Sequence, residues 1–117
     1  MPSSFDLVTL DAPSPRRAAA FWCEALSLEV SLDEDDGRWL VLSDGSGVRR
    51  IGLQHGAVRP GSVHLDVECA LDEFDRELAR LQQLGARLSA PARTEPYGRI
   101  ANLLDPDGNP FDLCAYL

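Results

Sequence analysis

Residues 105–109 read DPDGN and separate two apolar segments close to the end of the sequence. Proline presets φ for a turn, and the glycine after it tolerates positive φ, so this pentapeptide predicts a tight hairpin. Beyond the turn, Phe111, Leu113 and Ala115 alternate with more polar neighbours. This period of two predicts a strand that turns one face to a core and presents Asp112 on the other face.

Apolar residues recur with helical spacing in two segments, which we predict to be helices over residues 15–26 and 71–84. Ser14 and Pro15 suit the start of the first helix, and Gly85 suits the end of the second. We also expect Asp72 and Arg76 to pair on the surface of the second helix. The helical stripes contain Ala18, Phe21, Trp22 and Ala25 in the first segment and Leu71, Phe74, Leu78 and Leu81 in the second.

Strands are predicted around these helices, and they give both halves of the chain the same order of strand, helix and three strands. Aligning Ser27 with Gly85 gives an offset of 85 − 27 = 58 residues. The acidic segment 33–37 and the segment 90–98 are predicted as loops, and residues 56–61 as a linker. The predicted strands cover residues 5–10, 28–32, 38–43, 48–55, 62–68, 86–89, 99–104 and the segment from 111 onward.

Three groups of residues carry a resemblance to a known family. They are the DPDGN turn with the strand after it, Phe21-Trp22 followed by Leu26-Ser27-Leu28, and His64-Leu65-Asp66-Val67 followed by Leu84-Gly85-Ala86. In these residues the sequence resembles the glyoxalase, bleomycin-resistance and extradiol-dioxygenase superfamily, also called vicinal oxygen chelate proteins. The resemblance implies an α+β fold of two βαβββ modules, about residues 5–55 and 62–117, whose curved antiparallel sheets form a single domain around a cleft.

The resemblance also implies where a metal would bind, because members that use a metal hold it with residues on the first and last strands of each module. The second module offers His64 and Asp112, and the first offers Leu7 and, at 112 − 58 = 54, Gln54. Leu7 cannot bind a metal, and Gln54 is a weak neutral ligand. Because a catalytic ion usually takes three protein ligands, we expect no bound metal; a divalent ion held by His64 and Asp112 is the alternative.

Further residues are candidates for the same cleft. Trp39 is predicted to form a wall on which a ligand stacks, although an aromatic residue on a strand is also typical of a core or a dimer contact. Arg99 is predicted to reach an anion at the cleft mouth, with a solvated surface position as the alternative. His64 and Asp112 also suit a metal-free acid/base pair or a structural hydrogen bond. The expected ligand-binding residues are therefore His64, Asp112, Gln54, Trp39 and Arg99.

The net charge and the apolar segments of the sequence indicate which kinds of molecule the protein binds and where it is located. Lys and Arg total 11 and Asp and Glu total 19, which gives a net charge of 11 − 19 = −8. This charge argues against nucleic acid and favours cationic ligands. The sequence contains no apolar run long enough to span a membrane and no leader pattern, so we expect a cytoplasmic protein. The 3 cysteines are widely spaced and are predicted to be reduced packing residues.

Two functions from different classes follow. The first is a bleomycin-resistance-like protein that binds a small organic molecule in the cleft without a catalytic metal. The second is a metal-dependent lyase, isomerase or dioxygenase that acts on a substrate with adjacent oxygens. A dimeric regulator without a ligand is a third possibility. We also expect a homodimer, because each sheet has only one helix to cover it.

Overall fold

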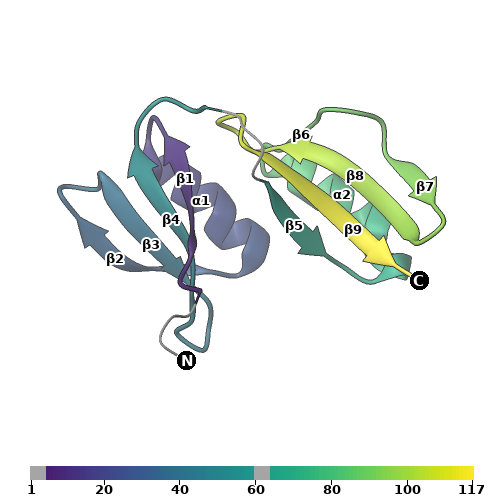
Figure 1. Cartoon of the computed structure of the whole chain (residues 1–117), viewed down its shortest axis with the longest axis horizontal. Coiled ribbons are helices and arrows are strands. Elements are labelled where there is room, and N and C mark those ends of the chain that lie inside the picture. The colour runs from purple at the N-terminus through teal and green to yellow at the C-terminus, as the bar shows by residue number, and fades with distance from the viewer. Residues whose placement is uncertain (1–4, 60–63) are drawn as a thin grey trace. The chain divides into compact units, whose positions relative to one another are not determined.

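The computed structural model describes residues 5–59 and 64–117. The chain divides into two compact units, Met1–Val58 and Arg59–Leu117, and each contains one sheet packed against one α-helix among the described residues (Figure 1). The predicted α+β fold is therefore confirmed. The last two residues of the predicted linker, 60 and 61, and the first two residues of the strand predicted over 62–68 lie outside the described residues.

The first unit contains a four-stranded sheet with the strand order β1-β4-β3-β2. Strand β1 runs parallel to β4, whereas β3 is antiparallel to both β4 and β2. Helix α1 contacts all four strands from one side of the sheet (Figure 1). The elements are β1 (Val8–Ala12), α1 (Pro15–Leu26), β2 (Glu29–Glu34), β3 (Trp39–Ser43) and β4 (Arg49–His55).

Helix α1 occupies the predicted residues, and its apolar stripe is buried as expected. Trp22 is 1% exposed and lies edge to face against Phe21, with ring centroids 5.0 Å apart. The helix ends where Ser27 adopts a left-handed conformation with φ 55° and ψ 49°. Ser14 precedes the helix, but its side chain accepts no capping hydrogen bond from the described residues. The predicted cap by Ser14 is therefore absent, and Pro15 alone suits the first turn.

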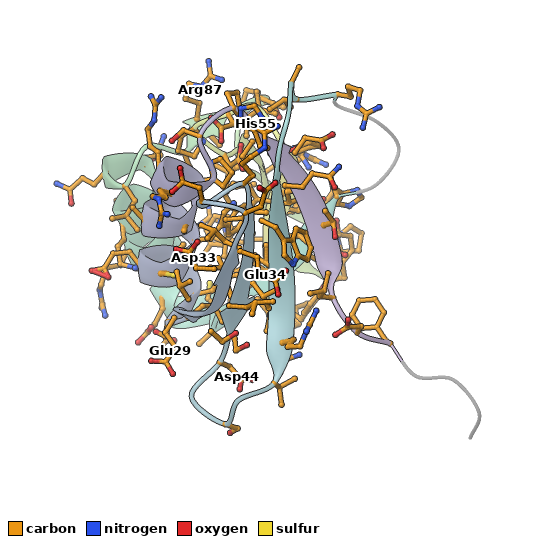
Figure 2. All side chains as sticks on the ribbon, turned by 90° about the vertical axis from the view of Figure 1, so that its left-hand side faces the viewer. Glu29, Asp33, Glu34, Asp44, His55 and Arg87 are labelled. Carbon is orange, nitrogen blue, oxygen red and sulfur yellow. The ribbon has the colours of Figure 1, made fainter. Side chains whose placement is uncertain are left out.

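Strand β2 forms one edge of this sheet and extends two residues further into the acidic segment than predicted. Its exposed side chains include Glu29, Asp33 and Glu34 (Figure 2). Like charges along an exposed edge oppose pairing with a strand of another molecule. The turn begins only at Asp35, where Asp35, Asp36 and Gly37 all have positive φ.

The second unit contains a five-stranded sheet with the order β5-β9-β8-β6, and β7 also pairs with β8. Strand β5 runs parallel to β9, and the other pairs are antiparallel. The elements are β5 (Leu65–Glu68), the 3₁₀ helix η1 (Leu71–Glu73), α2 (Phe74–Gln83), β6 (Arg87–Leu88), β7 (Arg93–Glu95), β8 (Gly98–Leu104) and β9 (Pro110–Tyr116).

Three details of this unit differ from the prediction. The segment 90–98, predicted as a loop, contains the short strand β7. The predicted second helix starts as a 3₁₀ turn, so the α-helix begins only at Phe74. Arg76 lies 3.7 Å from Glu73 instead of pairing with the predicted partner Asp72. Residues three and four positions before Arg76 are both within its reach on a helix.

The predicted alternation along β9 is confirmed. Phe111, Leu113 and Ala115 are at most 1% exposed, and α2 contributes the buried Phe74 and Leu81 to the same core. The opposite face of the sheet, which we call the open face, carries Asp112 on β9. None of the described helices has the length and apolar character needed to span a membrane.

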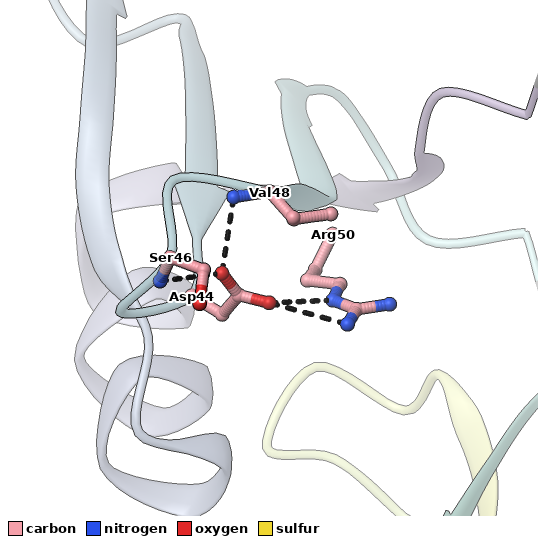
Figure 3. A network of polar contacts seen from close by, with 4 residues as sticks. All are labelled: Asp44, Ser46, Val48 and Arg50. Carbon is pink, nitrogen blue, oxygen red and sulfur yellow. Dashed lines mark hydrogen bonds and ion pairs between the residues drawn. The ribbon is translucent and has the colours of Figure 1, made fainter.

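Each unit has a hairpin between its last two strands. In the first unit, Asp44 closes the loop: its Oδ1 accepts hydrogen bonds from the amides of Ser46 (2.9 Å) and Val48 (3.0 Å), and its Oδ2 lies 3.1 Å from the Arg50 guanidinium (Figure 3). The register of β3 and β4 shifts between Leu42 and Ser43, which leaves Arg50 as an extra residue in β4. This is a β-bulge next to the turn.

Candidate functional site

His64, Asp66 and Asp112 lie together at the β5 side of the open face of the second sheet. The Nε2 atom of His64 is 3.3 Å from Asp66 Oδ1 and 3.3 Å from Asp112 Oδ2. Asp66 and Asp112 are partners in the parallel β5–β9 ladder. The structure therefore brings together the two residues predicted as ligands, His64 and Asp112, and adds Asp66.

Period-two alternation explains this arrangement. Residues 64 and 66 are two apart, so their side chains share one face, and the register aligns that face with Asp112. The side chains are 45%, 63% and 18% exposed for His64, Asp66 and Asp112 respectively. Asp112 is thus the most enclosed of the three, and solvent or a ligand can reach all of them.

Asp112 also belongs to a row of hydrogen bonds that crosses the sheet. Asn102 Nδ2 donates to Asp112 Oδ1 at 2.7 Å, and Arg93 Nη1 donates to Asn102 Oδ1 at 2.7 Å. Arg93 Nε in turn donates to Glu95 Oε1 at 2.8 Å. The row therefore connects β7, β8 and β9, and it leaves Asp112 Oδ2 on the side of His64.

Two further side chains of β9 belong to the face of Asp112. Burial raises the pKa of the Cys114 thiol. A hydrogen bond with Cys114 raises the pKa of Tyr116 to about 12. Both groups are consequently neutral near pH 7, so the negative charge of this face comes from its carboxylates.

The donor set suits a divalent cation in number and kind. One ligand atom from each of His64, Asp66 and Asp112 lies within 4.8 Å of the other two. One imidazole nitrogen and two carboxylate oxygens are borderline and hard donors, which suits first-row divalent ions. The count of three removes the shortage of ligands on which the sequence-based expectation of no metal depended.

Gln54 and Trp39 lie in the first unit and are neighbours in the β3–β4 ladder. Gln54 Nε2 donates a hydrogen bond of 2.9 Å to Asp11 Oδ1. The six-membered ring of the Trp39 indole lies over Gly52, and a Cβ atom at Gly52 would collide with this ring. The Leu7 side chain lies close to the same Cβ position. The first unit therefore presents an aromatic ring where the second presents carboxylates.

The register shows that Gly52, not Gln54, occupies the position equivalent to Asp112. Gly52 pairs with Val41 and with Thr9, whereas Asp112 pairs with Asn102 and with Asp66. Val41 and Asn102 each precede the aspartate of their hairpin by three residues. The offset of 58 from the helix ends does not hold at this point: it is 105 − 44 = 61 at the hairpin aspartates, and the extra residue in β4 reduces it to 112 − 52 = 60.

Arg99 is not brought together with the other predicted residues. Its guanidinium lies over the Phe74 ring at 4.4 Å from the centroid, and Nη1 donates to Asp75 at 2.7 Å. Arg99 pairs with Ala115 in the β8–β9 ladder, so it belongs to the face that α2 covers. Its position on this face favours a structural role.

A separate hollow of about 330 Å³ lies in the first unit, near the ends of β1 and β4 and the start of α1. Arg16, Arg38 and His55 contribute to its lining. Arg16 pairs with Asp33 at 2.6 Å and Arg38 lies 3.5 Å from Asp35, so much of its positive charge is compensated. Figure 2 labels His55, which lines this hollow, and Asp33, which is the partner of Arg16.

Sequence reasoning missed Asp66, Asn102 and Arg93 as members of the site. The signal for Asp66 was present, because residues 64 and 66 share a face of any regular strand. Asn102 and Arg93 gave no comparable signal. Their role depends on the pairing of β7 with β8, and β7 had not been predicted.

A comparison with protein families gives a match over most of the chain. A family model described as a glyoxalase-like domain matches residues 7–114. A search of curated protein sequences gave no significant match.

Solved structures show the same fold at low sequence identity. A mutant of the fosfomycin resistance protein FosX from Listeria monocytogenes, complexed with manganese(II) and 1S,2S-dihydroxypropylphosphonic acid, is 21% identical, with 100% of this chain and 93% of that chain covered and a TM-score of 0.80. A glyoxalase/bleomycin resistance protein/dioxygenase family enzyme from Burkholderia phytofirmans PsJN is 17% identical over 98% and 100% of the two chains, with a TM-score of 0.82. TioX from Micromonospora sp. ML1 is 19% identical over 98% and 100%, with a TM-score of 0.66.

Proposed function

We propose that this chain, which belongs to the family of glyoxalase-like domains, binds a small organic molecule on the open face of its second sheet, without requiring a catalytic metal. The observation that carries the proposal is the contact of His64 with Asp112 at 3.3 Å on a face that remains accessible. Polar side chains fixed on neighbouring strands give a ligand a rigid set of partners.

The charges of this face favour a ligand with a cationic or hydrogen-bond-donating group. Asp66 and Asp112 are ladder partners, so two carboxylates lie side by side. The net charge of −8 adds a long-range attraction for cations. Partial enclosure of Asp112 strengthens its interaction with a bound cation relative to a fully solvated carboxylate.

Trp39 and Gln54 are candidate ligand contacts on the sheet of the first unit, considered by itself. Trp39 is only half-buried although it packs over Gly52, so part of its ring remains available for stacking. Gln54 is exposed and offers an amide oxygen and nitrogen. We keep both residues as candidate ligand contacts of the first unit and leave Arg99 of the second unit out, since it is held by Phe74 and Asp75.

The test is a binding screen with small organic cations, anions and neutral amphiphiles, measured by ligand-observed NMR and then by calorimetry. We expect cationic compounds to bind and Asp112→Ala to reduce their affinity at least 10-fold. Asp75→Ala is the matched control, because Asp75 is an exposed aspartate of the same unit that lies on α2. Equal losses in the two variants, or no binding by any cationic compound, would contradict the proposal.

A metal-dependent enzyme is the second candidate, and the three donor atoms within 4.8 Å favour it. His64, Asp66 and Asp112 would hold the ion. A divalent ion there would act as a Lewis acid that polarises substrate oxygens. The neighbour FosX, whose structure was solved with manganese(II), is consistent with this alternative at the level of fold.

Elemental mass spectrometry of protein purified without chelators separates the two candidates. We expect well under one equivalent of Zn, Ni, Mn or Fe, because all three donors are accessible to water, which competes with them for the ion. One equivalent that is lost in His64→Ala, Asp66→Ala and Asp112→Ala would make the enzyme the leading function.

We also propose that the protein is a homodimer. Large apolar side chains remain exposed in the described residues, which is typical of surfaces that pair. Light scattering should give about twice the chain mass of 12.8 kDa. A monomer that persists at high micromolar concentration would contradict this proposal. The exposed set includes Val30, Leu71, Leu88, Tyr97 and Tyr116.

A further inference from the structure

We infer that Arg93 is a positioning residue for the site at Asp112 and that it acts through Asn102. This inference deepens the proposed function and rests on it for its biological meaning. Arg93 lies on β7 and donates to the Asn102 side chain, whose amide nitrogen in turn donates to Asp112.

The chemistry of the three side chains fixes the orientation of the Asn102 amide. A guanidinium only donates hydrogen bonds and a carboxylate only accepts them. The oxygen of Asn102 must therefore face Arg93 and its nitrogen must face Asp112, which is the observed arrangement at 2.7 Å on both sides. A flipped amide would place two donors together at one end and two acceptors together at the other.

Arg93 is itself held in place. Its Nε donates to Glu95 Oε1 at 2.8 Å while Nη1 donates to Asn102. These two bonds use different parts of the planar guanidinium, so they fix both its position and its tilt. Glu95 and Arg93 are two residues apart on β7, and the strand therefore presents them on one face.

The two carboxylate oxygens of Asp112 therefore have different partners. Asn102 occupies Oδ1, and Oδ2 lies 3.3 Å from His64 Nε2. When Arg93 is removed, Asn102 is bonded at one end only and its side chain can swing. Asp112 then loses a fixed donor, and the direction of Oδ2 is less well defined. Outer partners of this kind commonly change affinity by about 10–100-fold in metal sites.

A double-mutant cycle read by NMR tests the inference without any ligand. The measured quantity is the ¹³Cγ chemical shift of Asp112, assigned with Asp112→Asn. We expect Arg93→Met to move this resonance in the otherwise native protein and to leave it nearly unchanged in the Asn102→Ala background. Arg87→Met is the matched control, since Arg87 is an exposed arginine on β6 of the same sheet; it should move nothing.

An equal movement in both backgrounds would show a through-space charge effect and overturn the inference, as would no movement in either. Arg93→Gln, which keeps an amide donor of shorter reach, is measured beside Arg93→Met and should give an intermediate shift. Backbone amide spectra of α2 verify that each variant is folded. Calorimetry with cobalt(II) and with the cations of the binding screen is a separate measurement. If the variants give the expected shifts but the protein binds neither cobalt(II) nor any of these cations, the proposed function is contradicted and the positioning role of Arg93 is supported.

Discussion

Asp44 and Asp105 occupy the same place in the two hairpins, 105 − 44 = 61 residues apart. The Oδ1 atom of each accepts the amides two and four residues further on, at 2.9 and 3.0 Å for Asp44 and at 3.0 and 2.8 Å for Asp105. In each loop the fourth residue is a glycine with positive φ. The loops DGSGV and DPDGN share only the aspartate and this glycine, so these two residues carry the geometry.

Asp105→Ala should destabilise the protein strongly. Asp105 is 1% exposed and also accepts Asn109 Nδ2 at 3.1 Å, so its removal leaves several buried donors without an acceptor. We expect a loss of about 2–4 kcal/mol in urea unfolding. Asp44→Ala is the matched variant, and it should cost clearly less because water can replace the carboxylate there. Equal losses would contradict this reasoning.

Asp44 should contribute a pH-dependent part of the stability. The hydrogen bond from the Val48 amide, followed by those from the Ser46 amide and Arg50, lowers the pKa of Asp44 below 3.8. Because the folded-state pKa is depressed, the stabilisation is complete above the unfolded-state pKa and is lost as pH falls through the folded-state pKa. The difference in unfolding free energy between the native protein and Asp44→Asn should therefore be largest near pH 6–7 and shrink below about pH 4. A difference that stays constant down to pH 3 would count against it.

Gly52→Ala should disturb the first unit through Trp39. A Cβ atom at this position would collide with the indole ring. We expect a loss of about 1–3 kcal/mol and a shifted tryptophan emission, since overpacking forces the ring to move. Trp39→Leu should remove most of that loss in the double variant. Gly45→Ala is the control, because nothing lies within 4 Å of its Cβ position.

The cysteines should react slowly in the folded protein. Burial is the main cause that raises the pKa of Cys23, Cys69 and Cys114, so little thiolate is present at neutral pH. With Ellman's reagent at pH 7 we expect fewer than one thiol per chain to react quickly in the native state. All 3 should react in guanidinium chloride. Rapid native reaction of any one would contradict the interpretation of these residues as packing residues.

The fold was largely predictable from local signals. The bounds of α1 follow from Pro15 at one end and an apolar stripe that stops before Ser27. The final hairpin follows from the DPDGN turn. Strand β7 was missed because its three residues RTE have no alternating apolar pattern and lie between two prolines. A short edge strand of this kind is determined by its partner β8, which a local pattern does not contain.

The site was only partly predictable, for reasons of register. His64 and Asp112 came from strand alternation and from family resemblance, and they do lie together. Gln54 was assigned by the offset of 58 between the helix ends. The second unit has three more residues between its helix end and its hairpin (105 − 85 = 20 against 44 − 27 = 17), and the extra residue Arg50 offsets only one of them. Arg99 and Asn102 are three residues apart on β8, so their side chains point to opposite faces of the sheet. Arg99 therefore lies on the face that is covered by α2 and not on the face of Asp112.

The bulge at Arg50 shows a place where this sheet accommodates an added residue. An inserted residue within a ladder would turn every following side chain to the opposite face. Here the insertion lies beside the turn, where the pairing of Ser43 with Arg49 and of Leu42 with Ile51 accommodates it. Leu42 and Ile51 therefore remain buried, and the loop alone is displaced. A residue added beside the turn of a hairpin can thus change the length of the strand without moving buried side chains to the exposed face of the sheet.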